Sequence, residues 1–391
     1  MVKIASRNIL AFFVLVSVVY VFAPLISTYI FDVPYDYLAI YLFESSLLVL
    51  FIMAAFLCSK HFVYLDVPQI KLIRTILMGW LLLGLLLGCL ITIYGSVQAA
   101  LFASYIMRTG VEIPGTIKYI FYPVLTSATV YVSIGTSIMI IRKNELVPAH
   151  FIIILIFIAI LAVFAISGNR NLILWSISTP VAIFIGRSKL VTILILTSVM
   201  IFASYIMAIA RNIGAENIAR FSMPVFEAWN PMGQEFSTTY RIFRVLDSED
   251  MQINGYELPF SSYVLGIVNF LPSFAKPDDY KSFSNAISSQ LGEHGEGLGN
   301  SPVGEVSYNG IFPAILIQIL PFILVLKFIW NNPFSRKYVN MDNLLKMALL
   351  GSLVIMSFNF WRIGFAELVK IVLSYIVAYL IIGSIAYTKR Y

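Results

Sequence analysis

Apolar runs of about 20 residues recur along almost the whole chain, and this repetition limits what the chain can fold into. A run of roughly that length lets an α-helix cross the hydrocarbon core of a bilayer. Of the 391 residues, 60% are hydrophobic and 12% are charged, whereas a soluble domain averages about 45–50% apolar and about 25% charged residues. The sequence therefore predicts an all-α polytopic membrane protein.

The apolar runs and the breaks between them predict about ten transmembrane helices. The predicted spans are residues 8–30, 38–57, 72–94, 119–141, 149–167, 171–186, 189–210, 303–329, 344–360 and 364–387. The first run is too long for the apolar region of a signal peptide, so we interpret it as a membrane helix. The chain then divides into a seven-helix region (1–210), a polar insert (211–302) and a three-helix region (303–391).

The distribution of charge predicts the orientation of these helices. With the N-terminus inside, every predicted inside segment carries at least two Lys or Arg, such as Arg142 with Lys143, as the positive-inside rule requires. Asp342 and Lys346 also fall at the inside end in this arrangement. The insert is rich in Asp and Glu, so we expect it outside and both termini in the cytoplasm. The same rule explains the net charge of +6 without a nucleic-acid partner.

Two segments of the insert have predicted structure. Residues 234–246 have helical periodicity, with Tyr240 and Phe243 on one face and Arg241 and Arg244 on another. Residues 258–272 are apolar but too short to span a bilayer, so we expect an interfacial or re-entrant segment. The insert contains no cysteine, which excludes a disulfide or a thiolate metal site within it.

Several ionisable residues fall within or beside predicted spans, where they are costly and usually functional. All of them are expected at the outer end of the bundle, and nothing comparable is expected at the inner end. They are Glu44, Arg170, Arg211, Glu305, Arg362, Glu367 and Lys370. The planar fork of arginine suits phosphate oxygens, so this set favours a bound pyrophosphate. Snorkelling or internal ion pairing is the alternative explanation for each residue.

Short motifs in the second half of the chain resemble those of bacterial O-antigen and oligosaccharide repeat-unit polymerases (Wzy-type). Residues 304–310 read Gly-Glu-Val-Ser-Tyr-Asn-Gly and resemble the family's Gly-Glu-Ala-Tyr-x-Asn-Phe-Gly. The chain departs from that pattern at Val306-Ser307 and at Asn309-Gly310, which lacks the intervening aromatic residue. Three further segments resemble the family's Gly-x-Arg turn, its early loop helix and its Leu-Pro end, namely residues 168–170, 234–241 and 270–272.

The resemblance implies a GT-C-like membrane glycosyltransferase that is inverting, independent of metal and without a cofactor. It would polymerise oligosaccharide repeat units carried on undecaprenyl pyrophosphate, for lipopolysaccharide O-antigen, capsule or exopolysaccharide. Its active site would face the outside of the bacterial cytoplasmic (inner) membrane. The lipid-linked oligosaccharide and membrane lipids would be its partners, and a chain-length regulator protein is a further partner to test.

This chemistry needs a proton acceptor and a cationic cradle for the departing pyrophosphate. Candidates for the acceptor are Glu305, His294 and Glu235. Candidates for the cradle are Arg170, Arg211, Arg241 and Arg362, with Arg244 and Lys276 as further candidates. Tyr308 and Asn309, in the motif at 304–310, are candidate substrate-binding residues. We expect no metal site, because the sequence has no convergent cluster of oxygen ligands.

Three other functions remain open from the sequence. A ligase would use the same chemistry to move a finished glycan to another lipid acceptor. A transporter or flippase for a lipid-linked or small solute would instead need polar residues near the middle of the membrane. A metal-dependent polyprenyl-phosphate glycosyltransferase would need acidic ligands in the first outer loop, which is only about seven residues long.

Overall fold

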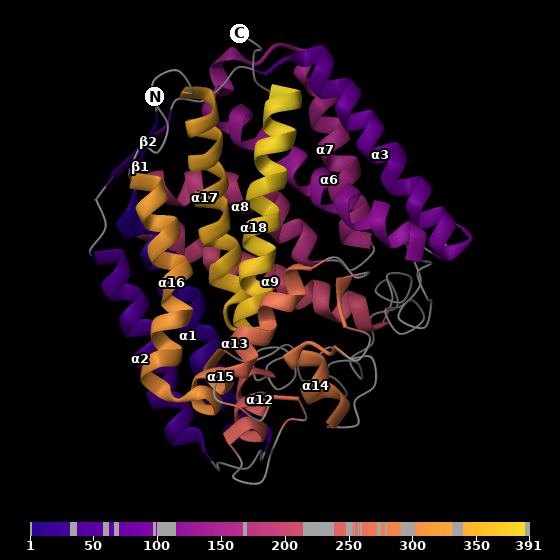
Figure 1. Cartoon of the computed structure of the whole chain (residues 1–391). Helices are drawn as coiled ribbons and strands as arrows, with labels where there is room; N and C mark the ends of the chain where they lie inside the picture. The colour runs from indigo at the N-terminus through magenta and orange to yellow at the C-terminus, as the bar shows by residue number, and fades with distance from the viewer. Residues whose placement is uncertain are drawn as a thin grey trace.

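The computed structural model describes most of the chain, and nearly all of what it describes is helical. The described residues are 2–31, 37–57, 62–65, 70–96, 99, 115–166, 170–213, 238–247, 253, 255–256, 258, 260–271, 275–277, 280–290, 302–330 and 339–387. Long helices form a bundle with both chain termini at one end, and a group of short helices lies at the other end (Figure 1).

A helix lies in each of the ten segments predicted as spans. These helices are α1 (Ser6–Phe31), α2 (Leu38–Leu57), α3 (Leu72–Tyr94), α6 (Gly115–Ile141), α7 (His150–Ile166), α8 (Arg170–Arg187), α9 (Leu190–Ile213), α16 (Ile311–Trp330), α17 (Val339–Asn359) and α18 (Phe365–Ile382), which continues as the π-helix η6 (Gly383–Tyr387).

Among the described residues, six helices are long and apolar enough to cross a membrane: α1, α2, α3, α6, α16 and α18 with η6. Helices α7, α8 and α9 are apolar over shorter stretches. The prediction of a helical membrane protein is confirmed at this level. The number of ten spans, their orientation and the GT-C-like architecture stay predictions.

The prediction of one continuous span over residues 303–329 is wrong. The chain forms the short helix α15 (Pro302–Asn309) and then α16, with Gly310 between them. Gly310 has a φ of 90°, a left-handed conformation that costs a residue with a Cβ atom and that glycine adopts readily. Glu305 therefore belongs to a separate helix and not to the long apolar one.

The short helices at the end away from the termini form what we call the cap. They are α12 (Thr238–Asp247), α13 (Ser261–Gly266), the 3₁₀-helix η3 (Ile267–Phe270), α14 (Phe283–Gln290) and α15. Helix α12 confirms the described part of the helix predicted at 234–246. The apolar segment predicted at 258–272 is divided into α13 and η3, and α14 was not predicted.

Aromatic contacts join the cap to the bundle. The ring of Tyr41 in α2 lies 5.3 Å from that of Tyr240 and 5.5 Å from that of Phe243, both in α12. The hydroxyl of Tyr41 donates to the carbonyl of Tyr20 in α1, at 3.0 Å. The apolar face predicted for α12 is therefore buried against α2, as an amphipathic helix requires.

A small two-stranded sheet lies at the end of the bundle that carries the termini (Figure 1). Strand β1 (Val2–Ala5) pairs antiparallel with β2 (Phe62–Leu65), with Val2 opposite Leu65. The ammonium group of Lys3 lies 3.7 Å from the centroid of the Phe62 ring, a cation–π contact. The sheet was not predicted, because each strand has only four residues beside a long apolar helix.

The expectation that buried charges lie only at the outer end is wrong. Asp342 and Lys346 are 8% and 7% exposed and form an ion pair of 2.7 Å in the first half of α17. Helix α17 begins at the end of the bundle that carries the termini (Figure 1). Helix α17 begins five residues earlier than the predicted span, so it includes Asp342 as well as Lys346. Their spacing of four places them on one helix face, and pairing offsets part of the cost of burying each charge.

Candidate functional site

Three segments that are distant in sequence meet where the cap joins the bundle. The hydroxyl of Thr239 in α12 donates to the carbonyl of Trp361, in the turn between α17 and α18. The indole of Trp361 donates to Ser17 in α1, at 3.0 Å. Helix α12 carries Arg241 and Arg244, and Arg362 follows Trp361 directly. The hydrogen bonds therefore fix the arginine-bearing helix beside the arginine-bearing turn.

Helix α15 packs closely against α12 at Gly304. A Cβ atom placed on Gly304 would lie only 2.6 Å from Cδ1 of Leu246 and 3.5 Å from the backbone of Phe243. The hydroxyl of Ser307, one turn further along α15, donates to the carboxylate of Asp247. The glycine of the motif at 304–310 therefore permits a close helix–helix contact within the cap.

Glu305, the acidic residue of that motif, is 2% exposed. Its Oε2 accepts a hydrogen bond from the backbone N–H of Phe365, at 3.0 Å. This N–H belongs to the first turn of α18, where an α-helix has no internal acceptor for its N–H groups, and a carboxylate there is favoured by the helix dipole. Glu305 thus joins α15 to the beginning of α18.

Asn309, at the end of α15, is also buried and uses both ends of its amide. Its Oδ1 accepts from the backbone N–H of Phe260, at 2.8 Å. Its Nδ2 donates to Ser262 Oγ at 2.9 Å and to the carbonyl of Glu305 at 2.7 Å. These bonds hold α13 against α15, so Asn309 positions the cap.

Tyrosine hydroxyls hold the remaining cap segments together. Tyr308 donates to the carbonyl of Tyr256 at 2.7 Å, Tyr256 to that of Lys281 at 2.7 Å, and Tyr280 to that of Leu265 at 3.1 Å. Burial raises the pKa of the Tyr256 phenol above its usual value, and the carboxylates of Glu367 and Glu305 add to this effect. Burial also raises the pKa of Tyr280. Both phenols therefore stay protonated and able to donate.

A group of charged residues lies beside these tyrosines, at the beginning of α18. The carboxylate of Glu367 interacts with the Ser282 hydroxyl and with the ammonium groups of Lys370 and Lys276. Lys276 also lies over the ring of Tyr280, with Nζ 5.5 Å from its centroid. This charged group brings Lys276, a candidate for the pyrophosphate cradle, close to Glu367 and Lys370. The sequence had singled out Glu367 and Lys370 only as charged residues within a predicted span. Ser282, Tyr256 and Tyr280 gave no signal in the sequence.

The other candidate cations are placed as follows. Arg362 and Arg244 are half-buried at the junction of the cap and the bundle. Arg241 lies in α12, Arg170 begins α8, and Arg211 lies in the last turn of α9; the structure describes the backbone of these three residues and not their side chains. Glu235 and His294 lie outside the described residues.

Two observations concern metal binding: two carboxylates lie near each other, and the described residues contain no larger group of metal ligands. Glu44 in α2 is buried and close enough to Asp247 in α12 for the two carboxylates to repel each other. Within the described part of the chain, no group of three or more His, Cys, Asp or Glu residues could hold a metal ion.

Polar groups also meet inside the bundle, away from the cap. The hydroxyl of Tyr375 in α18 lies 2.9 Å from each of Ser133 Oγ in α6, Ser178 Oγ and Thr179 Oγ1 in α8. Thr179 also donates to the carbonyl of Met347 in α17 at 3.2 Å. We call these four side chains the hydroxyl cluster. Tyr375 is ten residues after the beginning of α18, about 15 Å along its axis.

No family model matches the chain, and neither a curated protein nor a solved structure matches it.

Proposed function

We propose that the protein is a membrane glycosyltransferase that polymerises oligosaccharide repeat units carried on undecaprenyl pyrophosphate. The observation that carries this proposal is the junction of α12, α15 and the turn before α18. The Thr239–Trp361 and Glu305–Phe365 hydrogen bonds bring together the segments that carry Arg241 with Arg244, Glu305, and Arg362. Each of these arginines was a candidate for the pyrophosphate cradle, and the sequence motif resembling the polymerases lies in the same junction.

The physical reason concerns the leaving group. Transfer of a glycan from undecaprenyl pyrophosphate leaves negative charge on the pyrophosphate as the bond to the sugar breaks. Cations that are already held in place stabilise that charge without reorganisation during the reaction. Arginine is suited to this role because its fork binds two phosphate oxygens at once and remains charged when partly buried.

Proton transfer from the acceptor hydroxyl needs a base within hydrogen-bond reach. Glu305 is buried and already accepts from the Phe365 N–H, so we assign it a positioning role. Glu235 and His294 remain candidate bases. Glu367 joins them, because it lies on the first turn of α18 among Ser282, Lys276 and Lys370.

Substitution of Arg362 and Arg244 tests the proposal. Arg→Lys keeps the charge but loses the bidentate fork and should lower polymerisation; Arg→Ala should lower it on the order of 10²-fold, as loss of a preorganised donor does. The measurement is glycan length on the lipid carrier in a strain that lacks the native gene, with protein amount checked by immunoblot.

Arg142 is the control, because its Nη1 forms an ion pair of 2.6 Å with Glu145 in the turn between α6 and α7. Arg142→Ala should leave chain length unchanged. Long chains in both alanine variants at normal expression would exclude the cradle. A product that is a finished polymer transferred to a second lipid would instead identify the ligase alternative.

The hydroxyl cluster favours a second candidate, a transporter for a lipid-linked or small solute. Polar side chains about halfway along membrane helices line the pathways of many transporters. Interhelical hydrogen bonds between Ser, Thr and Tyr side chains also stabilise the packing of membrane helices in proteins that transport nothing. Purified protein in detergent separates the two functions, because only an enzyme lengthens lipid-linked glycans when no membrane divides two compartments.

A further inference from the structure

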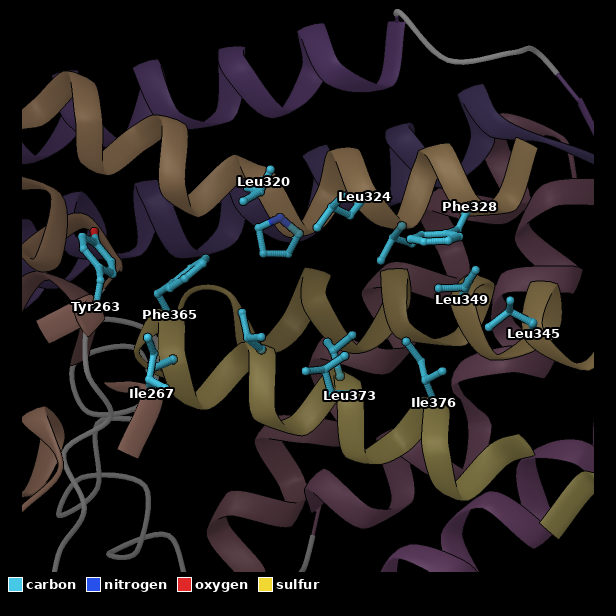
Figure 2. Close-up of a pocket in the computed structure, with 15 residues that line it drawn as sticks. Tyr263, Ile267, Leu320, Leu324, Phe328, Leu345, Leu349, Phe365, Leu373 and Ile376 are labelled. Atoms are coloured by element: carbon cyan, nitrogen blue, oxygen red, sulfur yellow. The ribbon is translucent and has the colours of Figure 1, made fainter. Parts of the chain in front are cut away.

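An apolar groove runs along the bundle between α16 and α18, with α17 as its floor (Figure 2). Its volume is about 440 Å³. Leu320 and Phe328 of α16, Phe365 and Leu373 of α18 and Leu345 of α17 all point toward it. Apart from Tyr263 at the end near the cap, every lining residue is apolar.

The dimensions of the groove match one hydrocarbon chain. The lining residues of α18 extend from Phe365 to Ile376. At the helical rise per residue, these two residues lie about 16 Å apart along the helix axis. That length is about half of the hydrocarbon core, so the groove is about one leaflet deep. At about 30 Å³ per heavy atom, taken from water, the volume holds roughly 15 carbon atoms.

The end of the groove near the cap has a cationic border. Lys370 is exposed and lies one helical turn from Ala366, which lines the groove. Its ammonium group is close enough to interact electrostatically with the ammonium group of Lys276, which repels it, and with the carboxylate of Glu367, which attracts it. Among the described residues of this group, two cations lie beside one anion. A lysine at this depth can extend toward the membrane surface while its stem stays in the apolar region.

We propose that the groove binds one acyl chain of an anionic phospholipid, whose phosphate contacts Lys370 and Lys276. The groove opens between α16 and α18, which are apolar enough to lie in a bilayer, and its residues Leu320, Phe328 and Leu373 are nearly half exposed. An acyl chain of the leaflet nearer the cap would fill it in both length and volume. An undecaprenyl chain has eleven five-carbon units, so most of it would lie outside the groove. The site does not depend on glycosyltransfer, because a phospholipid binds there without reacting.

Lipid selectivity of the unaltered protein is the first test. Protein in mild detergent is titrated with phosphatidylglycerol, phosphatidylethanolamine or a polyprenyl phosphate, and bound lipid is counted by native mass spectrometry. We expect phosphatidylglycerol to bind about tenfold more tightly than phosphatidylethanolamine, as for contacts to a charged group. Equal binding of the two, or preferential binding of the polyprenyl phosphate, would overturn the proposal.

Variants place the lipid in the groove. Leu373→Trp should fill it and remove the bound phosphatidylglycerol, and Lys370→Gln should remove only the preference for the anionic lipid. Leu77→Trp, on the exposed face of α3, is the matched control and should bind like the unaltered protein. Retention of phosphatidylglycerol by Leu373→Trp, an unchanged preference for it in Lys370→Gln, or its loss in the control would contradict the proposed site.

Should Leu373→Trp not fold, Val369→Phe makes a smaller change in the same wall. Because glycan polymerisation is not measured in these experiments, their failure leaves the proposed function unaffected. Failure of the arginine experiments likewise leaves the lipid site unaffected.

Discussion

Glu305 accepts a hydrogen bond from the backbone of Phe365 while almost fully buried, and this gives a prediction at the scale of one residue. Glu305→Gln keeps an oxygen that can accept this bond, so activity should stay within about tenfold of the unaltered protein. Glu305→Ala leaves the Phe365 N–H unpaired, at a cost of about 1–3 kcal/mol, and should lower both thermal stability and activity. Melting temperature and glycan length are the two measurements.

Glu145→Gln, at an exposed position, provides the control for loss of a carboxylate. If Glu305→Gln abolishes polymerisation while its melting temperature is unchanged, Glu305 acts as the base and not as a positioning residue. A stable and active Glu305→Ala variant would exclude both roles.

Single residues also show which part of the site the sequence can predict. Arg362 and Glu305 stand out because a charge beside an apolar span is costly, so both can be named as candidates without a structure. The partners of Glu305 and Asn309 are backbone groups of Phe365 and Phe260, and backbone groups leave no mark in the residue pattern. Asn309 stays a candidate substrate-binding residue, and the structure adds that its amide holds α13 against α15.

At the scale of an element, the break between α15 and α16 depends on Gly310. Gly310→Ala causes no steric clash, because no heavy atom lies within 4 Å of the added Cβ atom. The alanine must nevertheless adopt a φ of 90°. The strain should destabilise the protein by about 1–2 kcal/mol. Thermal unfolding in detergent measures this change.

Gly88→Ala is the matched control, since its Cβ would also meet open space while Gly88 lies inside α3. Alanine favours a helix interior by about 1 kcal/mol over glycine, so this variant should be as stable as the unaltered protein or more so. A Gly310→Ala variant with an unchanged melting temperature would show that the break does not require this conformation.

The ten helical segments could be predicted because each is a long apolar run between polar breaks. Hydropathy did not separate α15 from α16, because no polar run divides the two helices and only Gly310 lies between them. It also could not extend the span predicted at 344–360 to Asp342, because the ion pair of Asp342 with Lys346 reduces the cost that would otherwise exclude the carboxylate from a buried helix. Helix α14 of the cap depends on tertiary contacts, so local patterns alone did not predict it.

At the scale of the whole molecule, the cap and both termini lie at opposite ends of the bundle (Figure 1). The Lys and Arg residues in the segments on the side of the termini predict that this side faces the cytoplasm, with the cap outside. A reporter enzyme that is active only outside the cytoplasm should therefore be active when fused after Asp247, at the end of α12. The same reporter should be inactive after Lys143, in the turn between α6 and α7.

Fusion of a reporter that is active only inside gives the reciprocal pattern and controls for expression. The proposed polymerisation depends on this orientation, whereas lipid binding in the groove does not. A cap facing the cytoplasm would separate the candidate arginines from substrates presented at the outer face and would exclude the proposed polymerisation there. The lipid groove would then open to the inner leaflet, where anionic lipids are also found, so the lipid titrations would keep their expected result.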